Sequence, residues 1–438
     1  MYYNQTLVKL FALVVTAIFA SSCNRIVVRY AGESDLIQAS LPAPGKVCKE
    51  SENYIIDTNH LNATPIRYVR VNFHIMQESD GSGSWNEAEG RKFVHDIVEQ
   101  SNNRWNDNQP MTLPLGNSTP DLPIPIRIVL QRDPITGEEG IYFHRDDTLC
   151  YWNRSATKGP NSLSDRTVIS KYQVGIDSII NIFLIEHDPD SIGSPTYGEP
   201  KMSGISFINS IKLFSMYYQG HIVKYTNAGV PFTHDAFYFS KLLNHELGHC
   251  FNLNHTWNWD DSCDDTPKNS GCWSVTGIPP CDTPNSNNMM DYNISQQAVT
   301  PCQIGRMEYN FTKETGGARQ FAIPYWCEYH AFERVVVYRN ENLEWNGAKD
   351  LWGDIEIRDG ATLTIRCTVS LPEQAKVIIK PGGTLIIDGG TLTNRCGDKF
   401  EGVEIWENKK TDQIGKVMIS NGGKLENMVN YTTITTTE

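Results

Sequence analysis

One glutamate and three histidines lie within the segment His245–His255, which reads HELGHCFNLNH. Residues four apart on a helix share a face, so His245 and His249 can present two imidazoles to one metal ion, with Glu246 beside the open coordination position. Three histidine ligands leave zinc one open position, which is the catalytic pattern and not the structural one. Glu246 would then accept the proton of a zinc-activated water as that water attacks a carbonyl group.

The third histidine requires a change in the backbone. Six residues along a continuing helix correspond to a rotation of about 600°, which would place His255 on another face. The helix must therefore end, and the chain must reverse, between His249 and His255. Asparagine tolerates the left-handed conformation that ends helices nearly as well as glycine does, so the spacing predicts this turn at Asn252. The alternative is three unrelated histidines on an ordinary helix.

The motif, with Asn252 where most metzincins have glycine, resembles the pappalysin family of metzincin metallopeptidases, in its cytophagalysin branch. The resemblance covers residues 66–325 and is densest over residues 243–307. Further segments match the family in the same order: Thr256-Trp257, Asp265-Thr266-Pro267, Asn287–Tyr292 and Thr300–Met307.

The resemblance implies a zinc endopeptidase that acts on proteins or peptides. It places Met290 in a turn beneath the zinc, and it makes Tyr292 a residue that stabilises the oxyanion of the tetrahedral intermediate. Without the resemblance, Met290 reads as a core methionine and Tyr292 as a half-buried aromatic residue. Two other classes remain: a catalytically inactive surface lipoprotein, an adhesin or scaffold that retains the metzincin fold, and a different zinc hydrolase. The presence of both Glu246 and Tyr292 favours the peptidase.

The chain has 11 cysteines, more than is usual for a cytosolic enzyme. The resemblance implies two disulfides, Cys263–Cys281 and Cys272–Cys302, although the four residues alone allow three pairings. Cys48 has two interpretations, a disulfide with Cys150 or a thiolate that caps the zinc of a latent zymogen. We expect Cys367 to pair with Cys396 and Cys250 to be a buried thiol, which leaves Cys327 without an assigned partner.

Four acidic residues follow the zinc motif closely: Asp260, Asp261, Asp264 and Asp265. The family binds calcium in this region, but through a longer loop than this chain has. The cluster is therefore either a calcium site or a solvated acidic turn.

The pattern of apolar residues predicts the elements that position this motif. Alternation predicts a strand from Ile66 to Ile75, and apolar runs predict strands at 124–130 and 178–185. Helices are expected at 88–103 and at 235–251, the second of which carries His245 and His249. This order predicts an α/β (α+β) metzincin-like domain with a twisted open sheet and an active-site helix, over residues 66–330.

The last hundred residues differ in character. The segments 355–365 and 377–387 align at an offset of 22 residues, and 417–427 repeats the pattern with Val417 in the place of Val377. Short strands with a fixed glycine predict an all-β, β-solenoid-like domain over residues 331–438, with a small β-sandwich as the alternative. In the solenoid, Leu363 would stack on Leu385, Ile365 on Ile387, and Gly360 and Gly382 would mark one corner.

Composition limits the partners and the location. The chain has 438 residues and a net charge of −13, which argues against nucleic acid and anionic membranes as partners. Residues 1–22 read as a secretory signal peptide, and Cys23 after small residues is a candidate lipidation site. Residues 23–65 read as a linker or pro-segment. We therefore expect a secreted protein or a cell-surface or outer-membrane lipoprotein, held at the membrane only by an N-terminal lipid.

Overall fold

The computed structural model describes residues 26–431 except 134, 154–160, 176, 193–202, 224–232, 258–260, 273–274 and 294. The predicted signal peptide and Cys23 lie outside the described residues. The chain divides into two compact units: a larger unit of residues 49–324, and a smaller unit that combines residues 1–48 with residues 325–438. No helix in the described part of the chain is both long and apolar enough to cross a membrane.

The described part of residues 23–65 is folded into the two units and is therefore not a linker, whereas the pro-segment interpretation stays a prediction. Residues 26–38 contribute two strands to the smaller unit, and residues 49–65 belong to the larger unit, where Tyr54 and Ile56 are buried. The unit boundary also falls after Pro324, six residues before the predicted one. These strands pair with residues almost 400 positions away, so no local pattern indicates them.

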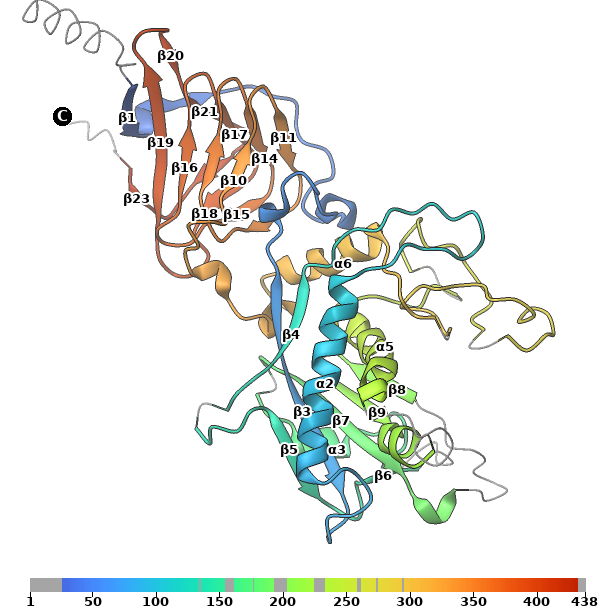
Figure 1. Ribbon diagram of the computed structural model, residues 1–438. Helices are drawn as coiled ribbons and strands as arrows, with labels where there is room; N and C mark the ends of the chain where they lie inside the picture. Colours follow the sequence, from blue (N-terminus) through green and yellow to red (C-terminus); the bar gives the residue numbers. More distant parts are fainter. Residues whose placement is uncertain are drawn as a thin grey trace, which may run out of the picture. The chain divides into compact units, whose positions relative to one another are not determined.

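The larger unit is built on a seven-stranded sheet in the order β4-β3-β7-β9-β8, with β5 beside β3 and β6 beside β7 (Figure 1). All pairs are parallel except β8–β9. The strands are β3 (Arg67–Gln77), β4 (Ile126–Leu130), β5 (Ile141–Arg145), β6 (Tyr151–Trp152), β7 (Ile180–His187), β8 (Ser203–Phe207) and β9 (Ser210–Phe214). Every residue of β7 is buried, as its apolar sequence predicts for a central strand. The α/β fold class is confirmed.

Two long helices pack against each other in this unit: α2 (Glu87–Asn106) and α5 (Thr233–Cys250) (Figure 1). The side chain of Asn86 caps α2 by accepting a hydrogen bond from the Glu89 amide. Ser101 of α2 hydrogen-bonds to Asn244 of α5, one residue before the first histidine of the motif. The described residues of this unit also form α3 (Thr167–Tyr172), a π-helical segment (Tyr218–Val223), α6 (Pro301–Thr312) and short 3-10 helices at Ser51–Tyr54, Leu61–Ala63, Pro189–Ser191 and Ala318–Phe321.

The smaller unit is a β-solenoid, as predicted, and not a sandwich. Successive coils of the chain each contribute a strand to three parallel sheets. The strand orders of these sheets are β10-β13-β16-β19, β11-β14-β17-β21 and β12-β15-β18-β22. The strands are β10 (Val335–Val337), β11 (Asn342–Trp345), β12 (Lys349–Asp350), β13 (Ile355–Ile357), β14 (Thr362–Ile365), β15 (Thr368–Ser370), β16 (Lys376–Ile379), β17 (Thr384–Asp388), β18 (Thr391–Thr393), β19 (Phe400–Asn408), β20 (Gln413–Ile414), β21 (Lys416–Ser420), β22 (Lys424–Leu425) and β23 (Met428–Asn430).

The predicted stacking within the solenoid is confirmed. Leu363 pairs with Leu385 and Ile365 with Ile387, and all four side chains are buried. Gly360 and Gly382 both have positive φ, 69° and 79°, so they form the expected corner. The phase predicted for the third repeat is wrong: Val417 pairs with Leu385 of β17, whereas Val377 pairs with Val403. The chain between β19 and β21 makes an extra hairpin with β20, which shifts the repeat.

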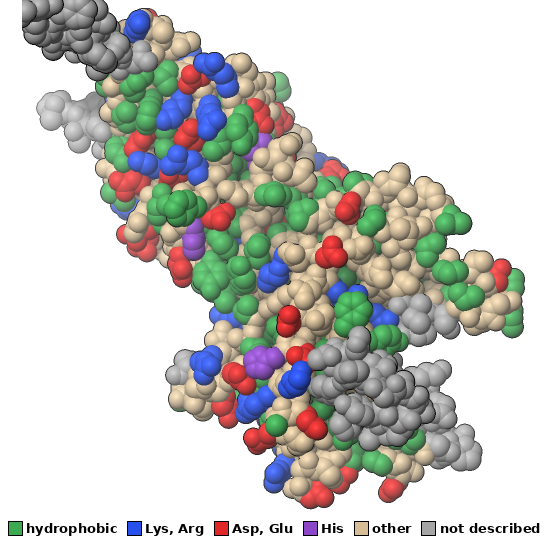
Figure 2. All heavy atoms as spheres, in the orientation of Figure 1, with side chains coloured by type: hydrophobic (Ala, Val, Ile, Leu, Met, Phe, Trp, Pro, Cys, Tyr) green, Lys and Arg blue, Asp and Glu red, His purple; other side chains and the backbone are tan. Residues whose placement is uncertain are grey.

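The N-terminal strands complete the smaller unit. Strand β1 (Ile26–Tyr30) pairs antiparallel with β19, and β2 (Leu36–Gln38) pairs parallel with β21. The outer surface of the solenoid carries interleaved charges (Figure 2), such as the ion pairs of Arg334 with Glu356 and of Lys376 with Glu404.

A histidine pair lies on the neighbouring strands β3 and β5 of the larger unit, with His74 buried and His144 partly buried. His74 of β3 donates from Nε2 to the Asn181 side-chain oxygen at 2.9 Å, and its Nδ1 lies 2.9 Å from Nε2 of His144. Burial and then the charge of His144 lower the pKa of His74 to about 3, and burial lowers the pKa of His144 to about 4.

Acid should therefore destabilise the larger unit. An unfolded histidine has a pKa of about 6.5, so the unfolded state binds more protons than the folded state between pH 6.5 and pH 3, and stability falls as the pH drops through that window. For His74 the expected loss of unfolding free energy from pH 7 to pH 5 is about 2 kcal/mol. Denaturant unfolding at both pH values, in wild type and in His74→Gln, measures it. An equal loss in both proteins would contradict the prediction.

Candidate active site

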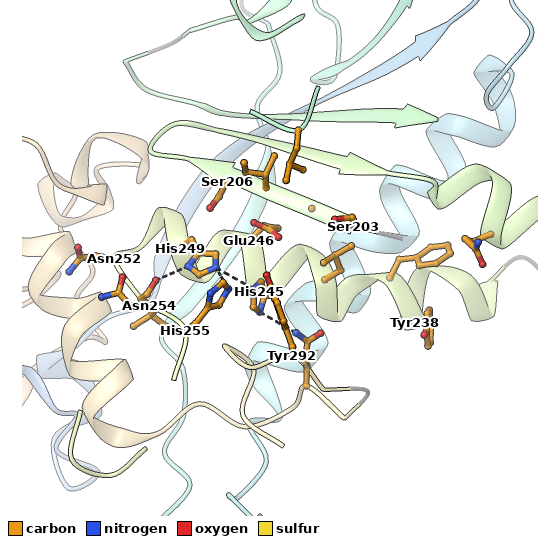
Figure 3. A pocket seen from close by; sticks show the side chains of 18 residues that line it. Ser203, Ser206, Tyr238, His245, Glu246, His249, Asn252, Asn254, His255 and Tyr292 are labelled. Carbon is orange, nitrogen blue, oxygen red and sulfur yellow. Dashed lines mark hydrogen bonds between the residues drawn. The ribbon is translucent and has the colours of Figure 1, made fainter. Parts of the chain in front are cut away.

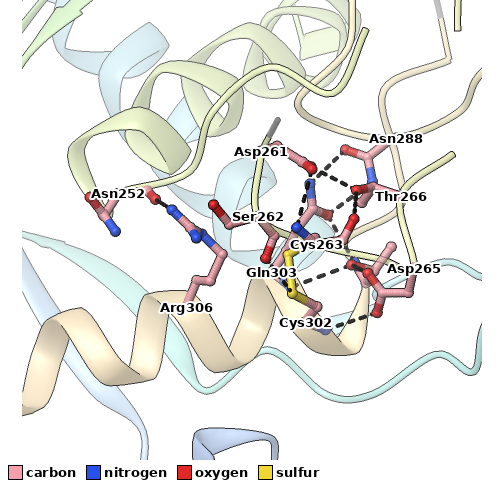
Figure 4. The surroundings of a disulfide bond; sticks show 11 residues. Asn252, Asp261, Ser262, Cys263, Asp265, Thr266, Asn288, Cys302, Gln303 and Arg306 are labelled. Carbon is pink, nitrogen blue, oxygen red and sulfur yellow. Dashed lines mark hydrogen bonds between the residues drawn. A yellow bond between two sulfur atoms is a disulfide. The ribbon is translucent and has the colours of Figure 1, made fainter. Parts of the chain in front are cut away.

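The active-site helix ends as the histidine spacing predicts. Asn252 has φ +79°, and the amide of Leu253 donates to the carbonyl of Gly248 at 2.9 Å. This left-handed residue turns the chain back within three residues of His249. Arg306 of α6 donates to the Asn252 carbonyl at 3.3 Å and so helps to hold the turn (Figure 4).

The turn brings the three histidines together. Their Nε2 atoms lie 3.2 Å apart for His245 and His249, 3.1 Å for His245 and His255, and 3.0 Å for His249 and His255. Four ligands placed tetrahedrally at 2.0–2.1 Å from zinc stand about 3.3–3.4 Å apart, so the arrangement is close to what zinc requires.

The hydrogen bonds of two rings show why these nitrogens need a cation. Nδ1 of His245 lies 2.8 Å from the Met289 carbonyl oxygen, and Nδ1 of His249 lies 2.8 Å from the Leu253 carbonyl oxygen. Both Nδ1 atoms must donate, so in the neutral rings both Nε2 atoms carry lone pairs. Lone pairs that point at one another repel unless a positive ion lies between them. The three residues therefore fit a zinc ion, and they form a metal-competent group.

The surroundings keep the imidazoles neutral, which is the form that binds metal. Burial lowers the pKa of His245 well below its usual value and lowers the pKa of His249. Burial, followed by the charge of His249, lowers the pKa of His255 to about 3.

Glu246 lies against the edge strand β8. Its side chain is buried, and burial raises the pKa of its carboxyl group to about 8, while a hydrogen bond from the Ser206 hydroxyl acts in the opposite direction. A bound dication would lower that pKa again and favour the carboxylate. A Cβ atom added to Gly204 would lie 2.6 Å from Glu246 Oε1, so the strand approaches the carboxyl group as closely as a glycine allows.

The segment Asn287–Tyr292, which follows the histidine motif in the sequence, forms the turn that carries Met290 and Tyr292. Met290 is fully buried, and its sulfur would lie 2.5 Å from a Cβ atom added to Gly248, so this glycine lets the turn pack directly under the helix. The Tyr292 side chain is 45% exposed, with its ring centroid 5.0 Å from that of His255 and 6.2 Å from that of His245. Met290 thus packs against the helix that carries His245 and His249, and Tyr292 lies beside His255.

Glu246, Tyr292 and the three histidines line one cleft of about 1010 Å³. Figure 3 shows Ser203 and Ser206 on the strand side of the cleft, facing Glu246 and the histidines on the helix side. The cleft is also lined by Leu163, Ile205, Tyr238, Phe239 and Leu242. Glu246 and the histidines are the only titratable lining residues apart from two tyrosines, among those that the structure describes.

The predicted disulfides of this region are wrong in their pairing. Cys263 bonds to Cys302 and Cys272 to Cys281. Four cysteines allow three pairings, and only the fold of the loop decides between them. The Cys263–Cys302 bond ties the loop after the zinc motif to the first turn of α6 (Figure 4).

The other cysteine predictions also need correction. Cys48 bonds to Cys367, which excludes both the pairing with Cys150 and a free thiolate over the zinc. Cys327 bonds to Cys396, so the predicted Cys367–Cys396 pair is wrong as well. These partners belong to one unit but come from distant parts of the chain. Cys150 and Cys250 are free and buried, and burial raises the pKa of both thiols.

The acidic cluster is held by protein donors. Asp261 accepts a hydrogen bond from Thr266 at 2.7 Å, and Asp265 accepts from the Thr300 hydroxyl and the Cys302 amide. Asp264 is exposed, and Asp260 lies outside the described residues. These contacts do not support the predicted calcium site.

Gly204→Ala should lower kcat and leave the metal bound. The new methyl group must displace the Glu246 carboxyl group, and a misplacement of about 1 Å can cost about 10²-fold in rate. Gly45→Ala is the matched control, since nothing lies within 4 Å of its added carbon. Steady-state kinetics and metal content measure the effect. Equal activity in both variants would show that β8 does not confine the carboxyl group.

Sequence reasoning missed the residues of β8 and two residues near Tyr292. Within β8, small and apolar residues alternate only over Gly204–Phe207, which is too short for a secure strand prediction. Gln296 lies 3.1 Å from Nδ1 of His245, and Asp291 accepts hydrogen bonds from Thr256, Asn269 and Ser286. Asp291 was part of a segment that matched the family, without a role of its own.

The segment that contains the three histidines is similar to known proteins. Residues 216–312 match the model of a peptidase family described as Pregnancy-associated plasma protein-A. No curated protein sequence matches the chain.

Among solved structures, mature mirolysin of Tannerella forsythia in complex with a cleaved peptide is 16% identical, with a TM-score of 0.40, over 59% of this chain and 97% of that one. A promirolysin mutant of the same organism is 16% identical, with a TM-score of 0.39, over 60% and 86%. The family match covers the segment that carries α5, the three histidines and the Met290 turn, and this similarity to the pregnancy-associated plasma protein-A peptidase family confirms the resemblance inferred from the sequence.

Proposed function

We propose that the protein is a zinc-dependent endopeptidase. The observation that carries the proposal is the meeting of three imidazole Nε2 atoms within 3.2 Å, beside a buried carboxyl group and in a cleft. His245, His249 and His255 would hold the zinc. Zinc would polarise the substrate carbonyl and acidify a water molecule.

The chain's own residues supply the proton chemistry. Glu246 takes the proton of the attacking water and passes it to the leaving amine, since it lies beside the metal ligands and is shielded from solvent. The hydroxyl group of the half-exposed Tyr292 hydrogen-bonds to the oxyanion that forms on the substrate. We also propose that the chain is exported, with residues 1–22 as its signal peptide and Cys23 as its lipid anchor.

Hydrolysis of a peptide library, with zinc content measured in parallel, tests the proposal. The purified protein should cleave peptides that are blocked at both ends. A chelator should abolish this cleavage, and added zinc should restore it. Cleavage of blocked peptides separates an endopeptidase from an exopeptidase. A protein that holds stoichiometric zinc but cleaves nothing would indicate the inactive surface protein. A protein without stoichiometric zinc would overturn the metal site itself.

A further inference from the structure

The three imidazoles of the proposed site are not held in the same way. His245 and His249 each have a backbone carbonyl 2.8 Å from Nδ1, which fixes the direction of the ring. Among the described residues, the hydrogen-bond contacts of His255 involve Nε2 alone. The direction of this ring must therefore come from its backbone and from packing.

The residue after His255 is tied to the turn of Met290 and Tyr292. Thr256 is 1% exposed, and its hydroxyl donates to Oδ1 of Asp291, which is also 1% exposed. Asn269 and the Ser286 hydroxyl both donate to Oδ2 of Asp291, Asn269 at 2.7 Å. Asn269 also lies 3.3 Å from the Thr256 hydroxyl oxygen. One buried carboxyl group thus joins three separate segments.

The residues that follow Thr256 and Asp291 in the sequence pack at the His255 ring. Trp257 follows Thr256 and stacks on His255 with ring centroids 3.9 Å apart, at an angle of 25°. The same indole lies 4.1 Å from the ring of Tyr292, the residue after Asp291. A shift of Thr256 would therefore move the third metal ligand and the ring that stacks on it together.

We propose that Asp291 is a positioning residue, which fixes the direction of the His255 imidazole through its hydrogen bonds to the hydroxyl group and the backbone amide of Thr256. Asp291 is buried and is not among the described residues that line the cleft. Backbone carbonyls orient His245 and His249 directly by hydrogen bonds. Asp291 takes this orienting role for His255, which lies outside the helix. This inference rests on the proposed metal site.

Metal binding tests the role independently of catalysis. In Thr256→Val the shape of the side chain is kept and the donor is lost, whereas Thr256→Ser keeps the donor. We expect Thr256→Val to weaken zinc and cobalt binding by about 10–100-fold, the usual cost of losing such a partner, and to alter the visible spectrum of the cobalt form. Thr256→Ser should retain the metal affinity and the cobalt spectrum of wild type. Asp291→Asn should lower kcat more than it changes KM.

Thr266→Val is the matched control, because Thr266 donates to Asp261 in a second buried pair of the same region at 2.7 Å. It should lower thermal stability and leave cobalt affinity unchanged. Wild-type affinity and spectrum in Thr256→Val would overturn the inference, as would an equal loss of affinity in Thr266→Val. A wild-type protein that binds neither zinc nor cobalt would instead overturn the proposed function.

Discussion

Glu246→Gln is expected to keep its metal and to lower kcat by about 10²–10⁴-fold. The amide has the shape of the carboxyl group and can still accept the hydrogen bond from Ser206, so the buried site should remain intact. It cannot accept a proton from water, and the general base is lost. Peptide hydrolysis and zinc content, measured on the same preparation, give the result.

Glu186→Gln provides the control for this substitution. Glu186 is also fully buried in the larger unit, and burial raises the pKa of its carboxyl group to about 8 as well. It accepts hydrogen bonds from the amides of Tyr217 and Tyr218 and lies outside the described lining of the cleft. This variant should retain the kcat of wild type. Activity of Glu246→Gln within about tenfold of wild type would point to another base.

His255→Ala should lose both metal and activity. The two histidines that remain on α5 supply only two nitrogen ligands, fewer than the three that catalytic zinc sites use. Elemental analysis after dialysis, at a zinc concentration that saturates wild type, measures the loss. His95→Ala removes a solvent-exposed histidine of α2 and should keep the metal. Full zinc content in His255→Ala would remove this residue from the site.

The sequence predicts most of the candidate site because its chemistry is local. The i, i+4 spacing of His245 and His249 and the left-handed tolerance of Asn252 together determine where three nitrogens meet. Met290 and Tyr292 followed from the resemblance to a family. Gly204 and Ser206 could not be predicted, because their role depends on an edge strand that reaches Glu246 from the far side of the cleft.

Long-range pairing limited the prediction of the fold. Offsets of 22 residues within the solenoid were enough to align Leu363 with Leu385, since each coil repeats the same turns. The hairpin of β19 and β20 broke that period before Val417. Disulfide partners and the pairing of β1 with β19 depend on the path of the whole chain, which local periodicity does not contain.

The order of the units along the chain determines what proteolysis can separate. The chain leaves the smaller unit after Cys48 and returns to it at Tyr325, so the larger unit is an insertion with two covalent connections. A single cut near residue 49 would leave the larger unit attached through residue 324. The N-terminal fragment would also stay bound to the solenoid, through the Cys48–Cys367 disulfide. A lipid on Cys23 would therefore remain with the solenoid, and two cuts would be needed to shed the unit that bears the histidines.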